Sequence, residues 1–91
     1  MQVQQMQSIR GNSKAANQYV IKTKHGQWFQ SYDSMIAYLP FRGKTLLGPD
    51  WDYSVTTGRY RNEFLNEGIA DTRAKIESGE YLISPTLGDN V

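Results

Sequence analysis

Cysteine is absent from this chain of 91 residues, and histidine occurs only once. Without cysteine there can be no disulfide scaffold, no thiolate metal site and no cysteine nucleophile. The absence is typical of proteins that work in a reducing environment, so we expect the chain to act in the cytoplasm. At this length the chain should form one small domain with a modest core.

Long apolar runs and an excess of one charge are also lacking. No stretch approaches the roughly 20 apolar residues that cross a bilayer, and residues 1–7 have neither the basic nor the apolar region of a signal peptide. Ten basic against nine acidic residues leave a formal charge of +1. This balance argues against a polybasic binder of nucleic acid or membranes, although a local basic patch stays open.

Apolar residues are sparse at the N-terminus. Residues 1–17 hold four glutamines, two serines and two asparagines, with only Val3, Met6 and Ile9 as larger apolar residues. Such a segment buries too little apolar area to offset its ordering entropy, so we expect a flexible tail. A short helix docked through Met6 and Ile9 is the alternative. The folded domain is predicted over residues 18–84, with residues 85–91 as a second tail.

From Gln18 onward the pattern indicates β-strands. Residues 19–24 and 27–32 read as a hairpin closed by His25 and Gly26, with Gly26 at positive φ in the turn. This register predicts one core face on the hairpin, made of Tyr19, Ile21, Trp28 and Tyr32. Two short strands follow at residues 35–39 and 44–47, ended by Pro40 and by Gly48-Pro49.

The period then changes to that of helices. Thr56 is the predicted N-cap of a first helix, in which Tyr60 and Phe64 lie four residues apart on one face. A second helix is predicted over residues 69–78 and ends at Gly79. Residues 81–83 form a last short strand. The fold class we predict is α+β: an antiparallel meander of about four short strands, two short helices packed on one face, and a C-terminal edge strand. A small curled barrel is the alternative.

Several short motifs of this chain occur together in a recognisable order. They are Gly26-x-x-Phe29-x-Ser31-Tyr32, Trp51-Asp52-Tyr53-Ser54-x-Thr56-Thr57 and Phe64-Leu65. Their succession resembles a group of small uncharacterised proteins of bacteriophages and mobile elements, a domain of unknown function. The resemblance extends over residues 19–83 and implies a phage or mobile-element origin, and thus the cytoplasm of a host cell. No activity comes with it.

Residues suited to catalysis or metal binding have simpler structural interpretations. His25 falls at the predicted hairpin tip, away from the partners that acid–base or metal chemistry requires. Asp50 and Asp52, with Asp33, fall short of the roughly six oxygen ligands of a hard cation. Ser54 and Thr56 have no accompanying base or oxyanion motif, and capping explains them better. We therefore expect no enzyme, no cofactor and no metal.

Partner binding is the remaining class of function. We predict a structural role for the large aromatics, because so small a core needs them: Trp28, Trp51, Tyr60 and Phe64. Thr56 and Gly26 are predicted to be structural as well, as the helix cap and the turn residue. Tyr53 is left open between core and interface. Exposed basic and aromatic residues around Arg42, Lys44, Arg59 and Arg61 would suit single-stranded nucleic acid.

We therefore expect a small non-enzymatic interaction protein that binds a host or phage protein. The alternative is a nucleic-acid-binding accessory protein that uses the surface around those four basic residues. The oligomeric state is left open.

Overall fold

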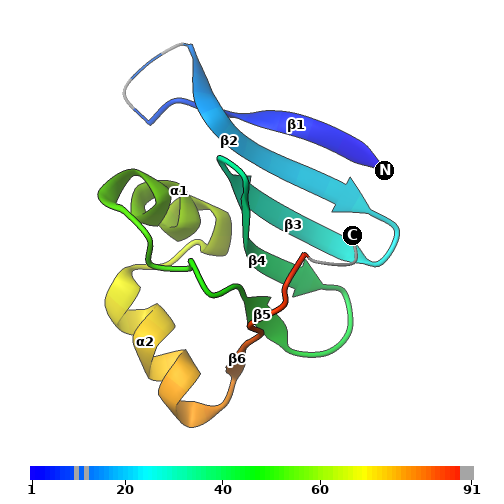
Figure 1. Ribbon diagram of the computed structural model, residues 1–91, viewed down its shortest axis with the longest axis vertical. Coiled ribbons are helices and arrows are strands. Elements are labelled where there is room, and N and C mark those ends of the chain that lie inside the picture. The colour runs from blue at the N-terminus through cyan, green and yellow to red at the C-terminus, as the bar shows by residue number, and fades with distance from the viewer. Residues whose placement is uncertain (10, 12, 89–91) are drawn as a thin grey trace.

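The strands of the sheet lie side by side in the order in which they occur along the chain, β1 to β6 (Figure 1). The computed structural model describes residues 1–9, 11 and 13–88. Its strands are β1 (Gln2–Gln7), β2 (Lys14–Thr23), β3 (Gly26–Ser31), β4 (Ser34–Pro40), β5 (Thr45–Leu47) and β6 (Tyr81–Ile83). Its helices are α1 (Val55–Leu65) and α2 (Ile69–Ser78). The predicted α+β class is confirmed, with six strands in place of about four.

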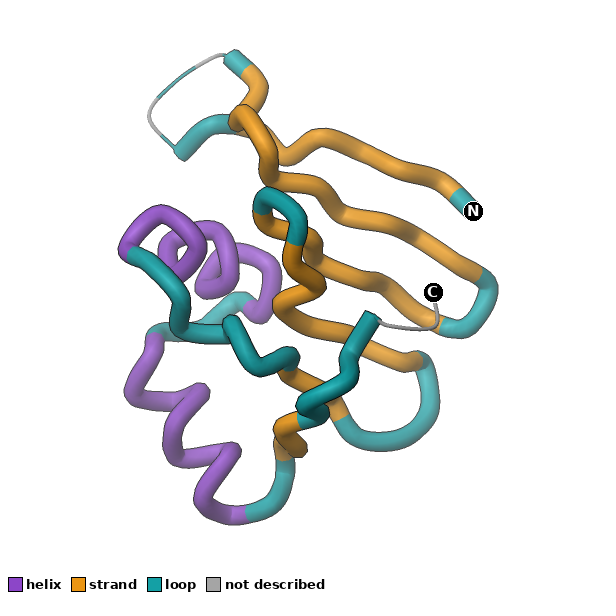
Figure 2. Tube along the Cα trace, in the orientation of Figure 1, coloured by secondary structure: helices purple, strands orange, loops and turns teal. Residues whose placement is uncertain are grey.

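The first five strands form an antiparallel meander, and β6 pairs with β5 in parallel. A parallel neighbour needs a crossover connection, and α1 and α2 provide it between β5 and β6 (Figure 2). The predicted second helix and last strand have the predicted bounds, Ile69–Ser78 and Tyr81–Ile83. Gly79, with φ of 83°, ends α2 as predicted.

The turn of the β2–β3 hairpin lies one residue earlier than predicted. Lys24 and His25 make the turn in place of His25 and Gly26, so Ile21 lies opposite Trp28. Gly26 has a positive φ of 158°, but it belongs to β3 and not to the turn. The backbone of β4 explains why a glycine stands there. A Cβ at Gly26 would collide with the carbonyl oxygen of Leu39 and lie 2.7 Å from Cα of Pro40.

The face of the sheet that the helices cover is the one carrying Phe29. The rings of Phe29 and Phe64 lie 5.6 Å apart, and the hydroxyls of Ser31 and Thr57 are hydrogen-bonded at 2.9 Å. The core is made of Ala15, Phe29, Ile36, Ala37, Leu47, Tyr60, Leu65 and Tyr81. The predicted core face, with Ile21 and Trp28, is therefore the wrong one for the helices. Strand alternation separates the two faces of a hairpin but does not say which one the helices will cover.

The expected N-terminal tail is wrong where the structure describes it as strand. Gln2–Gln7 pairs with β2 as β1, and β2 itself begins at Lys14. Glutamine supplies hydrogen bonds there in place of apolar area, since Gln5 Nε2 donates to the carbonyl of Ala15 at 2.8 Å. Met6 packs against the core, so the alternative contact through Met6 exists, although within a strand rather than a helix.

The C-terminal segment continues from β6 as turns. The backbone N–H of Ser84 donates to Leu47 at 2.8 Å, and that of Leu87 donates to Ser84. Gly88 lies against the side chain of Met35. Residues 89–91 of the predicted C-terminal tail lie outside the described residues.

The N-cap of α1 is Ser54 and not Thr56. The Ser54 hydroxyl accepts from the backbone N–H of Thr57 at 3.1 Å, so the helix starts two residues earlier than predicted. Val55 consequently opens the helix and is 72% exposed. Asn66, with φ of 58°, closes α1 in the left-handed conformation.

Candidate partner-binding surface

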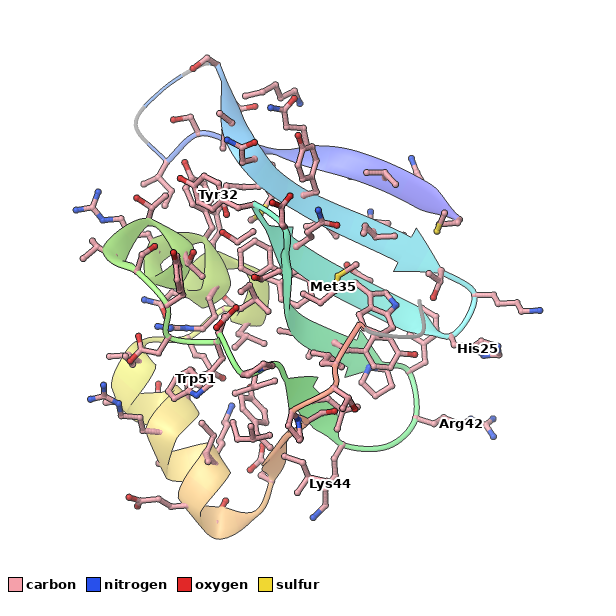
Figure 3. All side chains as sticks on the ribbon, viewed as in Figure 1. His25, Tyr32, Met35, Arg42, Lys44 and Trp51 are labelled. Atoms are coloured by element: carbon pink, nitrogen blue, oxygen red, sulfur yellow. The ribbon has the colours of Figure 1, made fainter. Side chains whose placement is uncertain are left out.

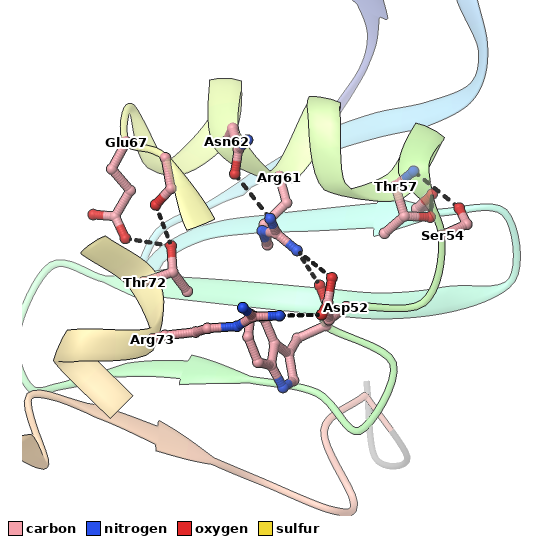
Figure 4. A network of polar contacts seen from close by, with 11 residues as sticks. Asp52, Ser54, Thr57, Arg61, Asn62, Glu67, Thr72 and Arg73 are labelled. Carbon is pink, nitrogen blue, oxygen red and sulfur yellow. Dashed lines mark hydrogen bonds and ion pairs between the residues drawn. The ribbon is translucent and has the colours of Figure 1, made fainter. Parts of the chain in front are cut away.

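Arg61 is a structural residue buried under α1. Its side chain is 1% exposed, although the sequence analysis places it on a basic surface. Nη1 donates to the carbonyl of Trp51 at 2.9 Å and lies 3.4 Å from Oδ1 of Asp52, and Nη2 donates to Asn62 (Figure 4). The guanidinium also lies over the Trp51 ring, 5.3 Å from its centre. Arg61 therefore holds the loop before α1 in place and is unavailable to a partner.

Trp51 is half-buried and packs against the core, consistent with the structural role expected of it. Asp52 joins this loop to both helices, because its other oxygen lies 3.3 Å from Nη2 of Arg73 on α2 (Figure 4). The loop that carries the Trp-Asp-Tyr-Ser motif is thus held by charge pairs and a cation–π contact. In this arrangement Arg61 stays buried, and Asp52 is paired with two arginines.

A second polar cluster joins the helices to β6 around Glu67. Its carboxylate, 6% exposed, accepts from Thr72 and Lys75 at 2.6 Å each and from the Tyr81 hydroxyl at 2.9 Å. Burial by itself raises the pKa of Glu67, but the donated bonds, that from Lys75 first, bring this pKa below its usual value. Burial raises the pKa of Tyr81, and the hydrogen bond of its hydroxyl to Glu67 raises it further. These directions mark Glu67 as an ionised structural residue.

The face of the sheet turned away from the helices is rich in aromatic and aliphatic side chains. We call it the outer face, and its apolar residues are Val3, Tyr19, Ile21, Trp28, Tyr38, Leu46 and Leu82. Of these, Ile21 is buried, and the others are half-buried or exposed. The rings of Trp28 and Tyr38 stack across β3 and β4, with centres 4.2 Å apart and an interplanar angle of 27°. Leu82 is 45% exposed. Neither helix covers this face, but residues 84–88 lie on it at Met35, against whose side chain Gly88 packs.

Basic side chains gather where the outer face meets two turns of the sheet. Lys24, His25, Arg42 and Lys44 are all exposed, and together with Tyr38 and Phe41 they surround an open hollow of about 490 Å³. Figure 3 shows His25, Arg42 and Lys44 projecting from this end of the molecule. We call these six residues the basic corner.

Among the described residues, no acidic side chain lines this hollow. Ion pairs in the described part of the chain involve Arg61, Arg73 and Lys75, none of which belongs to the basic corner. Lys44 Nζ donates to the carbonyl of Gly79 at 2.7 Å, which fixes that cation at the rim. Phe41 is 68% exposed beside these charges. The corner therefore combines an accessible ring with cations that an anionic ligand can reach.

The basic residues named from the sequence do not all meet. Arg42 and Lys44 belong to the basic corner, whereas Arg59 lines a different hollow, beside Val55 on α1. Tyr53 is exposed and lines a third hollow, of about 610 Å³, with Tyr32, Asp33 and Asp50. Trp28, expected in the core, is half-buried on the outer face. Tyr60 and Phe64 pack in or against the core as expected.

Of the three carboxylates considered as metal ligands, Asp33 and Asp50 line one hollow, and Asp52 lines another. Asp50 accepts from the Ser34 hydroxyl at 2.9 Å, while Asp52 binds arginines. Among the described residues, no three acidic, histidine or cysteine side chains come together as a metal site. His25 lies in the exposed β2–β3 turn, at the hairpin tip predicted for it.

The sequence contains a signal for the basic corner, but the near-neutral net charge of the whole chain obscures it. Residues 1–49 hold six basic residues and one acidic residue, whereas residues 50–91 hold four basic and eight acidic residues. The meander is therefore cationic and the helical half anionic. Counting the charges of the two segments separately indicates a cationic surface that includes Lys24, Arg42 and Lys44. Only the fold shows that His25 and Phe41 lie beside them.

Comparison with known families gives one assignment. The profile of DUF8033, a family of unknown function, matches residues 1–81. The chain belongs to DUF8033. The family match includes β1 and both helices, so it extends beyond the resemblance noted from the motifs. The searches of curated proteins and of solved structures found no match. Neither helix in the described part of this DUF8033 protein is long and apolar enough to cross a membrane.

Proposed function

We propose that this DUF8033 protein is a small non-enzymatic interaction protein of phage or mobile-element origin. It works in the host cytoplasm and binds another macromolecule through the outer face and the basic corner. From the sequence, a host or phage protein is the first candidate for that partner and a nucleic acid is the second. Both partners would use the same exposed surface.

The observation that carries this proposal is the basic corner itself. Cations and an exposed phenylalanine stand at the edge of a sheet face that neither helix covers. Exposed aromatic and arginine side chains are the residues that dominate binding hot spots. A ring that is 68% exposed contributes little to the core, so folding alone gives no reason for Phe41.

The non-enzymatic part of the proposal is supported by what the reactive groups already do. The Ser54 hydroxyl caps α1, and the Asp52 and Glu67 carboxylates bind cationic side chains. A nucleophile or a general base needs a free partner in hydrogen-bond reach of the substrate. These groups are instead used to join the helices to the sheet.

Site-specific photo-crosslinking in host lysate tests the proposal. A benzophenone amino acid is introduced in place of Phe41 or Leu82, and in place of Val55 as the matched control. Val55 is as exposed as Phe41 but lies on α1. We expect adducts from positions 41 and 82 and none from position 55. Adducts from position 55 alone, or from no position, would refute the proposed surface.

A further inference from the structure

We propose that the ligand of the basic corner is single-stranded nucleic acid, with its phosphates held by Lys24, Arg42 and Lys44 and a base stacked on Phe41. This inference rests on the proposed function and names the partner for the same surface. It replaces the basic surface expected from the sequence, since Arg61 is buried and Arg59 lies in another hollow.

The charge of the corner selects for an anion. Three basic side chains and His25 surround the hollow, and no carboxylate of the residues that the structure describes lines it. The remaining basic residues of the described helical half are largely neutralised locally, since Arg61, Arg73 and Lys75 each lie within 3.4 Å of a carboxylate. An anionic chain approaching the molecule is therefore attracted to the meander and repelled by the helical half.

The aromatic rings select for a planar apolar group beside that anion. Phe41 and Tyr38 both line the hollow, and Tyr38 is itself stacked on Trp28 at 4.2 Å. Each nucleotide of a single strand brings a flat base and a phosphate together, and such strands are bound by stacked rings within a cationic groove. An acidic peptide would satisfy the cations but would place no flat group on Phe41.

The size and position of the hollow favour a single strand over a duplex. Its volume of about 490 Å³ falls in the range of clefts that hold one small-molecule-sized group, roughly 300–1,000 Å³. Bases within a duplex are stacked on one another, so their faces cannot reach Phe41. The surface is built by the β2–β3 turn and the β4–β5 loop, and no helix stands there to enter a groove.

The test is fluorescence anisotropy with a labelled 12-mer of oligothymidylate, repeated with the same sequence annealed as a duplex and with a labelled polyglutamate peptide. We expect the single strand to bind, with log K falling against log salt with a slope of roughly −2, since about three phosphates can be contacted. Arg42→Ala with Lys44→Ala should weaken binding about tenfold or more. Phe41→Ala should weaken it without changing the salt slope.

Arg59→Ala is the matched control, because it removes an exposed arginine outside the corner. It should change the affinity less than twofold. The assignment to the corner is overturned if Arg59→Ala loses binding, or if the Arg42 and Lys44 variant keeps the affinity of the parent. Equal binding of the duplex overturns the assignment to single strands.

Failure of this inference is distinguishable from failure of the proposed function. If polyglutamate binds at the corner and the oligonucleotide does not, nucleic acid is the wrong partner, and an acidic protein segment takes its place. If neither binds but positions 41 and 82 still crosslink in lysate, the surface stands and the anionic partner is refuted. If neither binds and no crosslink forms, both proposals fail.

Discussion

Arg61 and Gln18 are both fully buried polar side chains, but their surroundings differ. Arg61 finds acceptors for both terminal nitrogens in Trp51, Asp52 and Asn62, and only its Nε has no hydrogen-bond partner among the described residues. Gln18 is 0% exposed, and neither its Oε1 nor its Nε2 has a hydrogen-bond partner among the described residues. A buried amide without partners costs free energy that an apolar side chain of similar shape would not.

Gln18→Met should therefore stabilise the fold, by about 1 kcal/mol. The free energy of unfolding from urea titration measures it. Gln4→Met, at an exposed position of β1, is the control and should stay within about 0.5 kcal/mol of the parent. A clear loss of stability in Gln18→Met would show that the amide has bonds that the structure does not account for.

Glu67 makes the stability depend on pH. Its pKa is below the usual value in the folded chain, so its contribution is present above the unfolded value of about 4.3 and is lost as pH falls through the folded pKa. Glu67→Gln should cost about 1.5–3 kcal/mol at pH 7, because it weakens bonds to a charged acceptor. It should also flatten the fall in stability that accompanies a decrease of pH below the unfolded value. The exposed Glu77→Gln is the control, and an equal flattening there would contradict this role.

At the scale of elements, β3 and β4 approach too closely for any side chain at Gly26. Gly26→Ala should cost more than about 1 kcal/mol, because the new methyl group would press on the backbone of Leu39 and Pro40. Gly68→Ala is the control, since Gly68 has φ of −89° and open space around it. Thermal unfolding of both variants checks the comparison. A neutral Gly26→Ala would mean that the two strands are placed too close.

The pairing of β1 with β2 predicts that the N-terminus contributes to stability. Deleting residues 1–8 removes β1 and the contact of Met6 with the core. We expect the unfolding midpoint to fall by at least about 4–8 °C, which corresponds to roughly 1 kcal/mol in a domain of this size. An unchanged midpoint would support the flexible tail that the composition of this segment suggests.

The elements that the sequence predicts well are those with local signals. The glycine after α2 and the proline-bounded strands depend on backbone rules that apply within a few residues. β1 is not predicted from the sequence. Its stability comes from pairing with β2 and from the hydrogen bond of Gln5 to Ala15, and no hydrophobic pattern indicates either. The cap at Ser54 was missed because Thr56 and Thr57 offer equivalent hydroxyls two and three residues later.

At the scale of the whole molecule, two segments of opposite charge are joined in one fold. The helical half uses its acidic residues to hold the helices, as at Asp52 and Glu67, while the meander leaves its cations exposed at the basic corner. Of the candidate site, Arg42 and Lys44 could be named from the sequence. The burial of Arg61 and the separation of Arg59 could not, because both depend on how α1 docks on the sheet.

A titration of the isotope-labelled protein with the 12-mer oligothymidylate, followed by amide chemical shifts, tests the central claim most directly. We expect salt-sensitive changes of the amide chemical shifts in the β2–β3 turn, the β4–β5 loop and the strand residues beside Tyr38. The amides of α1 and α2 should not change. Shifts centred on Tyr53 and the start of α1 would contradict the claim, as would a spectrum that does not change at millimolar oligonucleotide.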